Sequence, residues 1–239
     1  MEHIRKKQYG KKRKRNRLVL ILMTSFSMLI LGFITFTLLT TYSFTSNFGN
    51  FGLSIQTPNM PVMIDSVGNR IVKEMLLTPN PYSRPQTILR EVNSVVIHYT
   101  ANPGTDAEAN RNYFENLKTS HATYASSHFV IGLDGQIIQC IPLNEISFAS
   151  NNRNGDTISI ECCHPGDTGE FSLETYESLV ALTAWVCEEY SLSEEDILRH
   201  YDVSGKNCPL YYVNNEDAWL TLKEDVMNTV SDSFENDQD

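Results

Sequence analysis

The chain has 239 residues, of which 41% are apolar, and this is enough for one domain with a sizeable hydrophobic core. Its formal net charge of −10 is unevenly distributed, because nine of the 19 basic residues lie within residues 1–17. The rest of the chain holds 10 basic and 28 acidic residues. Such an acidic body lacks the clustered basic side chains that phosphate contacts need, which excludes a nucleic-acid-binding protein.

An uncharged run of 22 residues, Leu18–Leu39, directly follows the basic segment 1–17. As a helix it is about 33 Å long, which is enough to span the hydrocarbon core of a bilayer. Basic residues at its N-terminal flank keep that end in the cytoplasm, so the acidic body is placed outside. A cleavable signal peptide is the alternative, but it has a shorter apolar region, and no clear Ala-x-Ala site follows Leu39. We therefore expect an uncleaved, single-pass anchor in the cell membrane at 18–39.

Residues 40–69 are predicted to be an extracellular linker, because most of this range is uncharged and rich in Ser, Thr, Asn, Gly and Pro. At its end, Asp65–Leu77 is predicted to form a short amphipathic helix. Three prolines within Thr78–Pro85 exclude both a regular helix and a central strand there. We expect the folded domain at 70–230 and an acidic disordered tail at 231–239.

Within the folded domain, apolar runs that predict strands alternate with segments that predict helices. The expected strands are Ser94–Thr100, Ser127–Leu133, Gln136–Ile141 and Asp156–Cys163. Asp134-Gly135, between the second and third of these, is typical of a tight hairpin turn. The expected helices are Asp106–Leu117, Leu173–Tyr190 with Ser172 as its N-cap, Ser193–Leu198 and Asn215–Met227. This alternation predicts an α/β fold with a mixed central sheet flanked by helices.

Three polar residues lie in or at the end of apolar runs, where reactive side chains are often presented: His98, Glu161 and His200. Each alone is more often a hydrogen-bonded core residue or a solvated side chain. Together with Cys208, however, the two histidines provide three zinc ligands and leave a fourth position open, as in catalytic zinc sites. Such a site activates a water molecule and also needs a proton acceptor and a cation near the developing oxyanion. Glu161 suits the first role and Lys206 the second.

Four segments in this order, VVIHYT, SSHFVIGLDGQIIQCIP, SIEC and ILRHYDVSGKNCP, resemble the zinc-dependent type 2 N-acetylmuramoyl-L-alanine amidases. That family shares its fold with peptidoglycan recognition proteins and phage lysozyme-type amidases, and the resemblance covers roughly residues 78–230. It implies a Zn²⁺ cofactor held by His98, His200 and Cys208, with Glu161 as the catalytic glutamate and Lys206 as the active-site lysine. It also implies hydrolysis of the amide between N-acetylmuramic acid and L-alanine in peptidoglycan. The anchored domain would then face the cell wall.

The chain departs from the family pattern at two places. Family members often carry Trp-His-Ala-Gly after the hairpin, with a histidine that lines the substrate groove, whereas Ile146–Ser150 contains no histidine. Some relatives also place a catalytic tyrosine immediately before the position of His128, where this chain has Ser127. Catalysis is therefore expected to depend on Glu161 and Lys206, and His128 is interpreted as structural.

Two other functions remain open at this point: a non-catalytic peptidoglycan-binding module of the same fold, and a zinc peptidase that acts on the stem peptide. The pairing state of the other four cysteines is also open. Alternation along the strand places Cys163 on the same face as Glu161 and Cys162 on the opposite face. A Cys140–Cys162 disulfide is conceivable in an exported domain, but buried free thiols are favoured for all four residues, Cys140, Cys162, Cys163 and Cys187. The sequence leaves the two alternatives open.

Overall fold

The computed structural model describes residues 63–236. The basic segment 1–17, the predicted anchor Leu18–Leu39 and most of the predicted linker lie outside these residues. Among the helices of residues 63–236, none combines the length and the apolar character needed to cross a membrane.

The domain is built around a seven-stranded mixed sheet with the strand order β1-β2-β5-β4-β6-β3-β7. Its strands are β1 (Ser66–Val67), β2 (Arg70–Glu74), β3 (Ser94–Tyr99), β4 (Phe129–Ile131), β5 (Ile137–Gln139), β6 (Thr157–Cys162) and β7 (Ile197–Arg199). The β1–β2 and β4–β5 pairs are antiparallel, and the other neighbours run parallel. The predicted α/β class with a mixed central sheet is thus confirmed.

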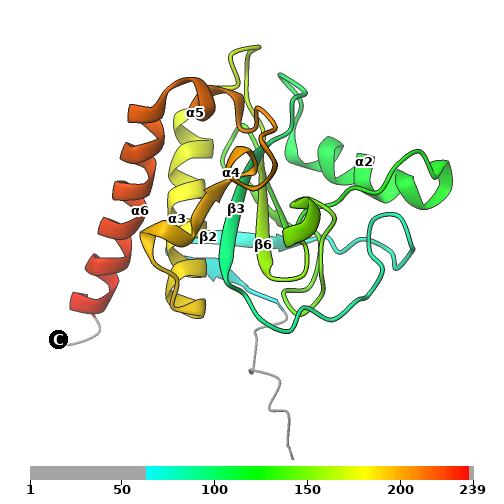
Figure 1. The fold of residues 1–239 in the computed structure, drawn as a ribbon, viewed down its shortest axis with the longest axis horizontal. Coiled ribbons are helices and arrows are strands. Elements are labelled where there is room, and N and C mark those ends of the chain that lie inside the picture. Colours follow the sequence, from blue (N-terminus) through cyan, green and yellow to red (C-terminus); the bar gives the residue numbers. More distant parts are fainter. Residues whose placement is uncertain (1–62, 237–239) are drawn as a thin grey trace, which may run out of the picture. The chain divides into compact units, whose positions relative to one another are not determined.

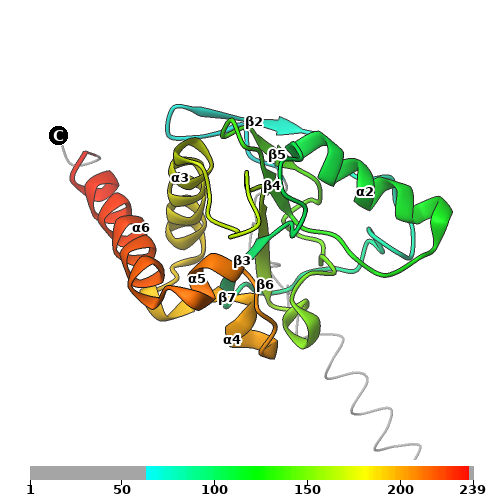
Figure 2. The same cartoon turned by 90° about the horizontal axis from the view of Figure 1, so that it is seen from above.

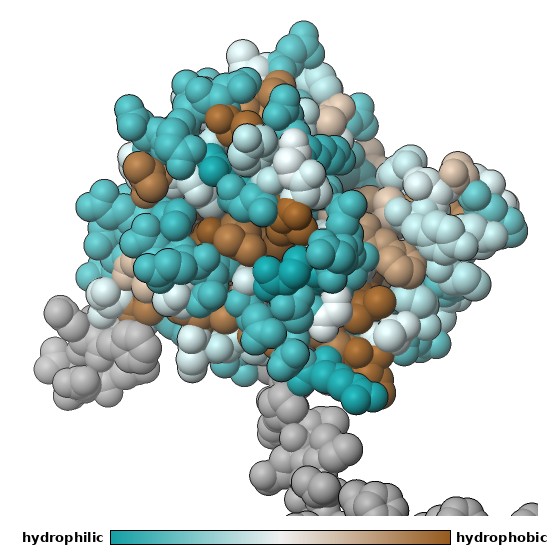
Figure 3. All heavy atoms as spheres, viewed as in Figure 1, coloured by the Kyte–Doolittle hydropathy of each residue, from teal (hydrophilic) through white to brown (hydrophobic). Residues whose placement is uncertain are grey.

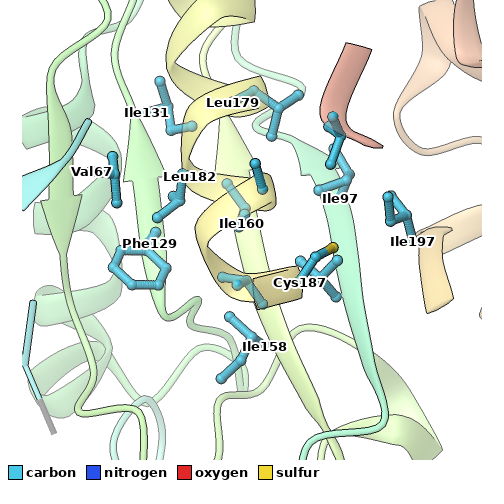
Figure 4. Close-up of a cluster of buried hydrophobic side chains, with 14 of the residues drawn as sticks. Val67, Ile97, Phe129, Ile131, Ile158, Ile160, Leu179, Leu182, Cys187 and Ile197 are labelled. Carbon is cyan, nitrogen blue, oxygen red and sulfur yellow. The ribbon is translucent and has the colours of Figure 1, made fainter. Parts of the chain in front are cut away.

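Helices cover both faces of the sheet (Figures 1 and 2). On one face lie α3 (Leu173–Tyr190) and α6 (Glu216–Asn236), and on the other lies α2 (Ala107–Ser120). The main hydrophobic core fills the space between the sheet and α3, with Ile97, Ile160 and Leu182 among its fully buried residues (Figure 4). A smaller core beneath α2 contains Val130 from β4. α2 packs on β4 and β5, toward one side of this face of the sheet.

Short helical segments complete the chain between the main elements: η1 (Asn151–Arg153), η2 (Glu194–Asp196), α4 (His200–Ser204) and α5 (Leu210–Asn214).

The predicted helix Leu173–Tyr190 has the same bounds in the structure, and its N-cap is Ser172, whose hydroxyl accepts from the N–H of Thr175. The hairpin between β4 and β5 is also confirmed, but its turn is longer than a two-residue primed turn. Of Asp134 and Gly135, only the glycine has positive φ, at 77°. A Cβ at Gly135 would also lie 2.8 Å from the Glu174 carbonyl oxygen, so glycine is needed at this position for space as well.

The predicted helix at Asp65–Leu77 is wrong. Ile64, Val67 and Ile71 are spaced like one face of a helix, but Ile71 is 82% exposed and only Ile64 and Val67 are buried. Gly68, with φ of 56°, turns the chain between β1 and β2, and β2 then pairs in parallel with β5. Pairing with the sheet therefore overrides the local helical pattern.

Two further expectations differ from the structure in their extent. Within Ser193–Leu198 only η2 is helical, and the chain then enters the edge strand β7, which pairs in parallel with β3. The last helix begins at Glu216, one residue after the predicted start, and continues to Asn236. It therefore includes residues 231–236, the first part of the expected acidic tail.

His128 is the centre of a buried hydrogen-bonded network, which agrees with its interpretation as a structural residue. Its Nδ1 accepts from the Ser159 N–H at 3.0 Å, and its Nε2 donates to the Glu145 carbonyl oxygen at 2.9 Å. Ser127 belongs to the same network, since its hydroxyl donates to the Ser159 carbonyl oxygen at 2.9 Å. Burial lowers the pKa of His128 to about 4, so the ring is neutral.

Replacing His128 by leucine is expected to lower the free energy of unfolding by about 2–4 kcal/mol, because two buried backbone groups lose their partners. Urea denaturation measures this change. A loss below about 1 kcal/mol would show that the network contributes little to stability.

All five cysteines are free and buried. As predicted from strand alternation, Cys162 packs in the core beneath α3, whereas Cys163 packs in the core beneath α2. The two thiols therefore lie on opposite faces of the sheet. The structure favours the free-thiol alternative over a Cys140–Cys162 disulfide.

Candidate functional site

The predicted site residues come together near the C-terminal ends of β6, β3 and β7. His98 near the end of β3 is the register partner of Glu161 near the end of β6, so the two side chains emerge side by side. His200 follows the neighbouring strand β7 directly, as the first residue of α4. The loop after α4 brings Lys206 and Cys208 to the same place. Parallel pairing of β6, β3 and β7 thus gathers residues that are separated by up to 110 positions.

His98, His200 and Cys208 are all buried, and one ligand atom from each lies within 4.8 Å of the others. Nδ1 of His98 is 3.1 Å from Nδ1 of His200 and 3.8 Å from Sγ of Cys208. In a tetrahedral site, typical zinc bond lengths separate two nitrogen ligands by about 3.3 Å and a nitrogen from a sulfur by about 3.6 Å. These two separations are close to those values, so the donor set fits a zinc ion.

The protonation states of the histidines also suit a metal. Burial lowers the pKa of His98 well below its usual value, and the neighbouring His200 and Lys206 act in the same direction. Burial likewise lowers the pKa of His200 to about 4, again with help from Lys206. Both rings are therefore neutral near pH 7, which is the form that binds a metal. Burial raises the pKa of Cys208 to about 12, so a metal would have to displace the thiol proton.

Glu161 and Lys206 line the same groove as the two histidines. One carboxylate oxygen of Glu161, Oε2, is buried and has no hydrogen-bond partner among the described residues. Burial raises the pKa of Glu161 to about 8, and the positive charge of Lys206 opposes this shift. Lys206 itself is exposed at the groove wall. The site therefore contains a carboxyl group that can exchange a proton near neutral pH and an exposed cation.

Arg199, the residue before His200, fixes the start of α4 through several polar contacts. Arg199 is buried, and its guanidinium forms an ion pair with Asp202 at 2.9 Å and another with Glu216 at 2.6 Å. It also donates to the carbonyl oxygen of Tyr212 at 3.0 Å. These contacts join the end of β7 to α4, α5 and α6. Asp202, which also accepts from the Arg199 N–H, thus supports the loop and lies outside the group of metal-binding atoms.

The groove has a volume of about 400 Å³, and aromatic side chains form part of its wall. Tyr124 is exposed and stacks on Tyr82 with 5.1 Å between ring centroids, while Phe148 meets Tyr124 edge-on at 5.6 Å. On the face seen in Figures 1 and 3, apolar residues form small separate areas between hydrophilic ones. The groove is therefore suited to a polar ligand that carries some apolar surface.

The structure also shows what occupies the two positions that depart from the family pattern. Phe148 and Ala149, within the segment that lacks the expected histidine, line the groove. Ser127, at the position of the expected tyrosine, is turned into the His128 network.

Sequence reasoning missed Asn151, whose Oδ1 lies 2.7 Å from Nε2 of His200. Its segment, Asn-Asn-Arg-Asn-Gly, has only the composition of an ordinary turn, so no signal in the sequence pointed to this contact.

Comparisons with known proteins agree with this site. A model of the N-acetylmuramoyl-L-alanine amidase family matches residues 89–210, just over half of the chain, and this range contains all five candidate site residues. The chain is 33% identical over 168 residues to the N-acetylmuramoyl-L-alanine amidase BlyA of Bacillus subtilis (strain 168), covering 62% of this chain and 44% of BlyA. It is 35% identical over 171 residues to the amidase CwlL of Bacillus licheniformis, covering 66% of this chain and 46% of CwlL. The chain thus spans less than half the length of either relative.

Solved structures give the same result at the level of the domain. The catalytic domain of XlyA is 27% identical with a TM-score of 0.55, and the match covers 65% of this chain and 98% of that domain. A mutant endolysin from Bacillus subtilis is 25% identical with a TM-score of 0.56, covering 66% and 99%. Fold, sequence and the buried His-His-Cys group therefore agree, and the chain belongs to the N-acetylmuramoyl-L-alanine amidase family.

Proposed function

We propose that this protein hydrolyses the amide bond between N-acetylmuramic acid and L-alanine in peptidoglycan, with a zinc ion held by His98, His200 and Cys208. The observation that carries the proposal is the buried group of three donor atoms within 4.8 Å of one another. Two of the three residues, His98 and His200, line one groove with Glu161 and Lys206, in a chain of the amidase family. Zinc bound at this position supplies Lewis-acid activation of water and of the scissile carbonyl.

Glu161 is proposed to move the proton. Its carboxyl accepts a proton from the attacking water and gives it to the leaving amine of L-alanine, because an amine leaves readily only when protonated. The pKa of about 8 places this exchange near neutral pH, where a general base and acid work best. A buried oxygen without a protein partner is available for the water.

Lys206 is proposed to stabilise the negative charge that develops on the carbonyl oxygen. It lines the groove, and none of the ion pairs among the described residues involves it, so its charge is available to the substrate. The uncharged groove wall around Tyr124 and Phe148 then accepts the rest of the muropeptide. The aromatic rings offer apolar faces for a sugar or for an alkyl side chain.

We further propose that Leu18–Leu39 anchors the protein in the cell membrane, with residues 1–17 in the cytoplasm and the amidase domain facing the cell wall. This part of the proposal rests on the hydropathy and charge of the sequence. Protease treatment of intact protoplasts should digest the domain but leave a small membrane-embedded fragment. A protected domain would contradict the orientation.

Product analysis tests the proposed activity. We expect the full chain, incubated with purified peptidoglycan and zinc, to release stem peptides that begin with a free L-alanine amino group. Mass spectrometry should find intact muramic acid on the glycan strands, and chelation of the metal should stop release. New amino termini within the stem would instead indicate a peptidase. Cosedimentation with peptidoglycan and no new termini would indicate a non-catalytic binding module.

A further inference from the structure

The outer ring nitrogen of His200, meaning the one that is not among the metal-binding atoms, has a hydrogen-bond partner. The outer ring nitrogen of His98 has none among the described residues. Nδ1 of His200 faces Nδ1 of His98 within the metal-binding group, and Nε2 is 2.7 Å from Oδ1 of Asn151. Nε2 of His98 is buried and has no hydrogen-bond partner among the described residues. Of the two histidines, His200 is thus the one whose outer nitrogen is hydrogen-bonded, and Asn151 is its partner.

This contact selects one tautomer of the ring. A neutral imidazole carries a single proton, and a nitrogen that binds a metal must present its lone pair. An amide oxygen can only accept, so its place beside Nε2 requires the proton there and leaves Nδ1 free for the metal. If the amide were turned round, its NH₂ group would donate to Nε2 and the proton would move to Nδ1. Whether the oxygen or the NH₂ group of the Asn151 amide faces Nε2 therefore decides whether Nδ1 of His200 is free to bind the metal.

The backbone of Asn151 is held in a conformation that aims this side chain. Its φ is 53°, in the left-handed region, where glycine is most readily accommodated and asparagine is among the better tolerated other residues. The loop around it is fixed from both sides: Asn154 Oδ1 accepts from the N–H groups of Ala149 and Ser150, and Arg153 forms an ion pair with Asp156 at 2.8 Å. A glycine would satisfy the turn, so the asparagine side chain is not needed for the turn itself.

We propose that Asn151 is a positioning residue: its amide oxygen holds His200 in the Nε2–H tautomer and in the orientation that presents Nδ1 to the metal. This inference rests on the proposed function only in taking the His98, His200 and Cys208 group to bind a metal. Partners of the outer nitrogen of a metal-binding histidine commonly fix the ring in this way, and their loss typically lowers metal affinity about 10–100-fold.

Three variants of the full chain separate the amide oxygen from the turn. Asn151→Gly keeps the left-handed turn and removes the acceptor. Asn151→Asp keeps an acceptor oxygen at the same distance along the side chain. Asn152→Gly changes the exposed neighbouring residue, for which no contact with His200 is recorded, and serves as the matched control.

The measurement is zinc affinity, determined by competition with a chromophoric chelator, together with the ¹⁵N shifts of the His200 ring in the metal-free protein. We expect Asn151→Gly to bind zinc about 10–100-fold more weakly and to lose the Nε2–H preference. Asn152→Gly should bind zinc with an affinity within about threefold of that of the wild type. Asn151→Asp should bind zinc no more than about threefold more weakly than the wild type. Wild-type affinity in Asn151→Gly, or equal weakening in Asn151→Asp, would overturn the inference. A wild-type protein that binds no zinc would instead overturn the proposed function.

Discussion

Glu161→Gln is expected to reduce peptidoglycan hydrolysis by about 10²–10⁴-fold while leaving the fold and zinc binding intact. Glutamine has nearly the same size as glutamate but cannot take up a proton from water. The fold should tolerate the change, because Oε2 of Glu161 is buried without a hydrogen-bond partner and no described neighbour loses a bond to it. Release of L-alanine amino termini, measured against time, gives the rate. The melting temperature and the zinc content should match those of the wild type.

Glu189→Gln is a suitable control for this experiment, because Glu189 is exposed on α3, on the other face of the sheet. It makes the same chemical change away from the groove and should keep full activity. If Glu161→Gln retained more than about a tenth of the wild-type rate, Glu161 would not be the proton-transfer group, and another residue of the groove would have to take that role.

Cys208→Ser is expected to remove most of the stabilisation that zinc gives to the domain. A ligand at about 1,000 times its dissociation constant stabilises the folded state by about 4 kcal/mol, which raises the melting temperature by roughly 10 °C in a domain of this size. The serine hydroxyl is a much weaker zinc ligand than a thiolate, so most of this shift should disappear. Differential scanning calorimetry with and without zinc measures it directly.

The control for this variant must remove a buried thiol that does not bind the metal. Cys187→Ser does so, since Cys187 packs in the core beneath α3. It should lower the melting temperature of the metal-free protein, because a polar group is buried there, yet keep the full shift on addition of zinc. A full zinc shift in Cys208→Ser would contradict the assignment of Cys208 as a ligand.

Much of the fold could be predicted because its strongest signals are local. Leu173–Tyr190 has both a capping serine and a continuous apolar face, and its bounds are the same in the structure. The β4–β5 hairpin carries a glycine that the turn requires. The error at Asp65–Leu77 has the opposite cause: its apolar spacing is helical, and the strands form only because β5 offers an edge with which β2 can pair. No local pattern reports such a distant partner.

Most of the site residues likewise have a local signal in the sequence, and Asn151 has none. His98, Glu161 and His200 could be proposed because each has the chemistry of a ligand or a proton carrier and lies in or next to a strand end. Cys208 could be proposed because it follows His200 closely in the sequence and adds a thiol to the two imidazoles. Parallel pairing of β6, β3 and β7 then brings the strand ends together. Asn151 could not be found, since its role depends on one contact across 49 positions and on a backbone conformation that its neighbours impose.

A zinc titration of the metal-free protein tests the central claim most directly. Bound zinc and the rate of release of L-alanine amino termini from peptidoglycan should be measured on the same samples. If the buried His-His-Cys group forms the active centre, both quantities should rise together and level off at one zinc per chain. Full activity in the metal-free protein, or one bound zinc per chain with no release of L-alanine amino termini, would contradict it.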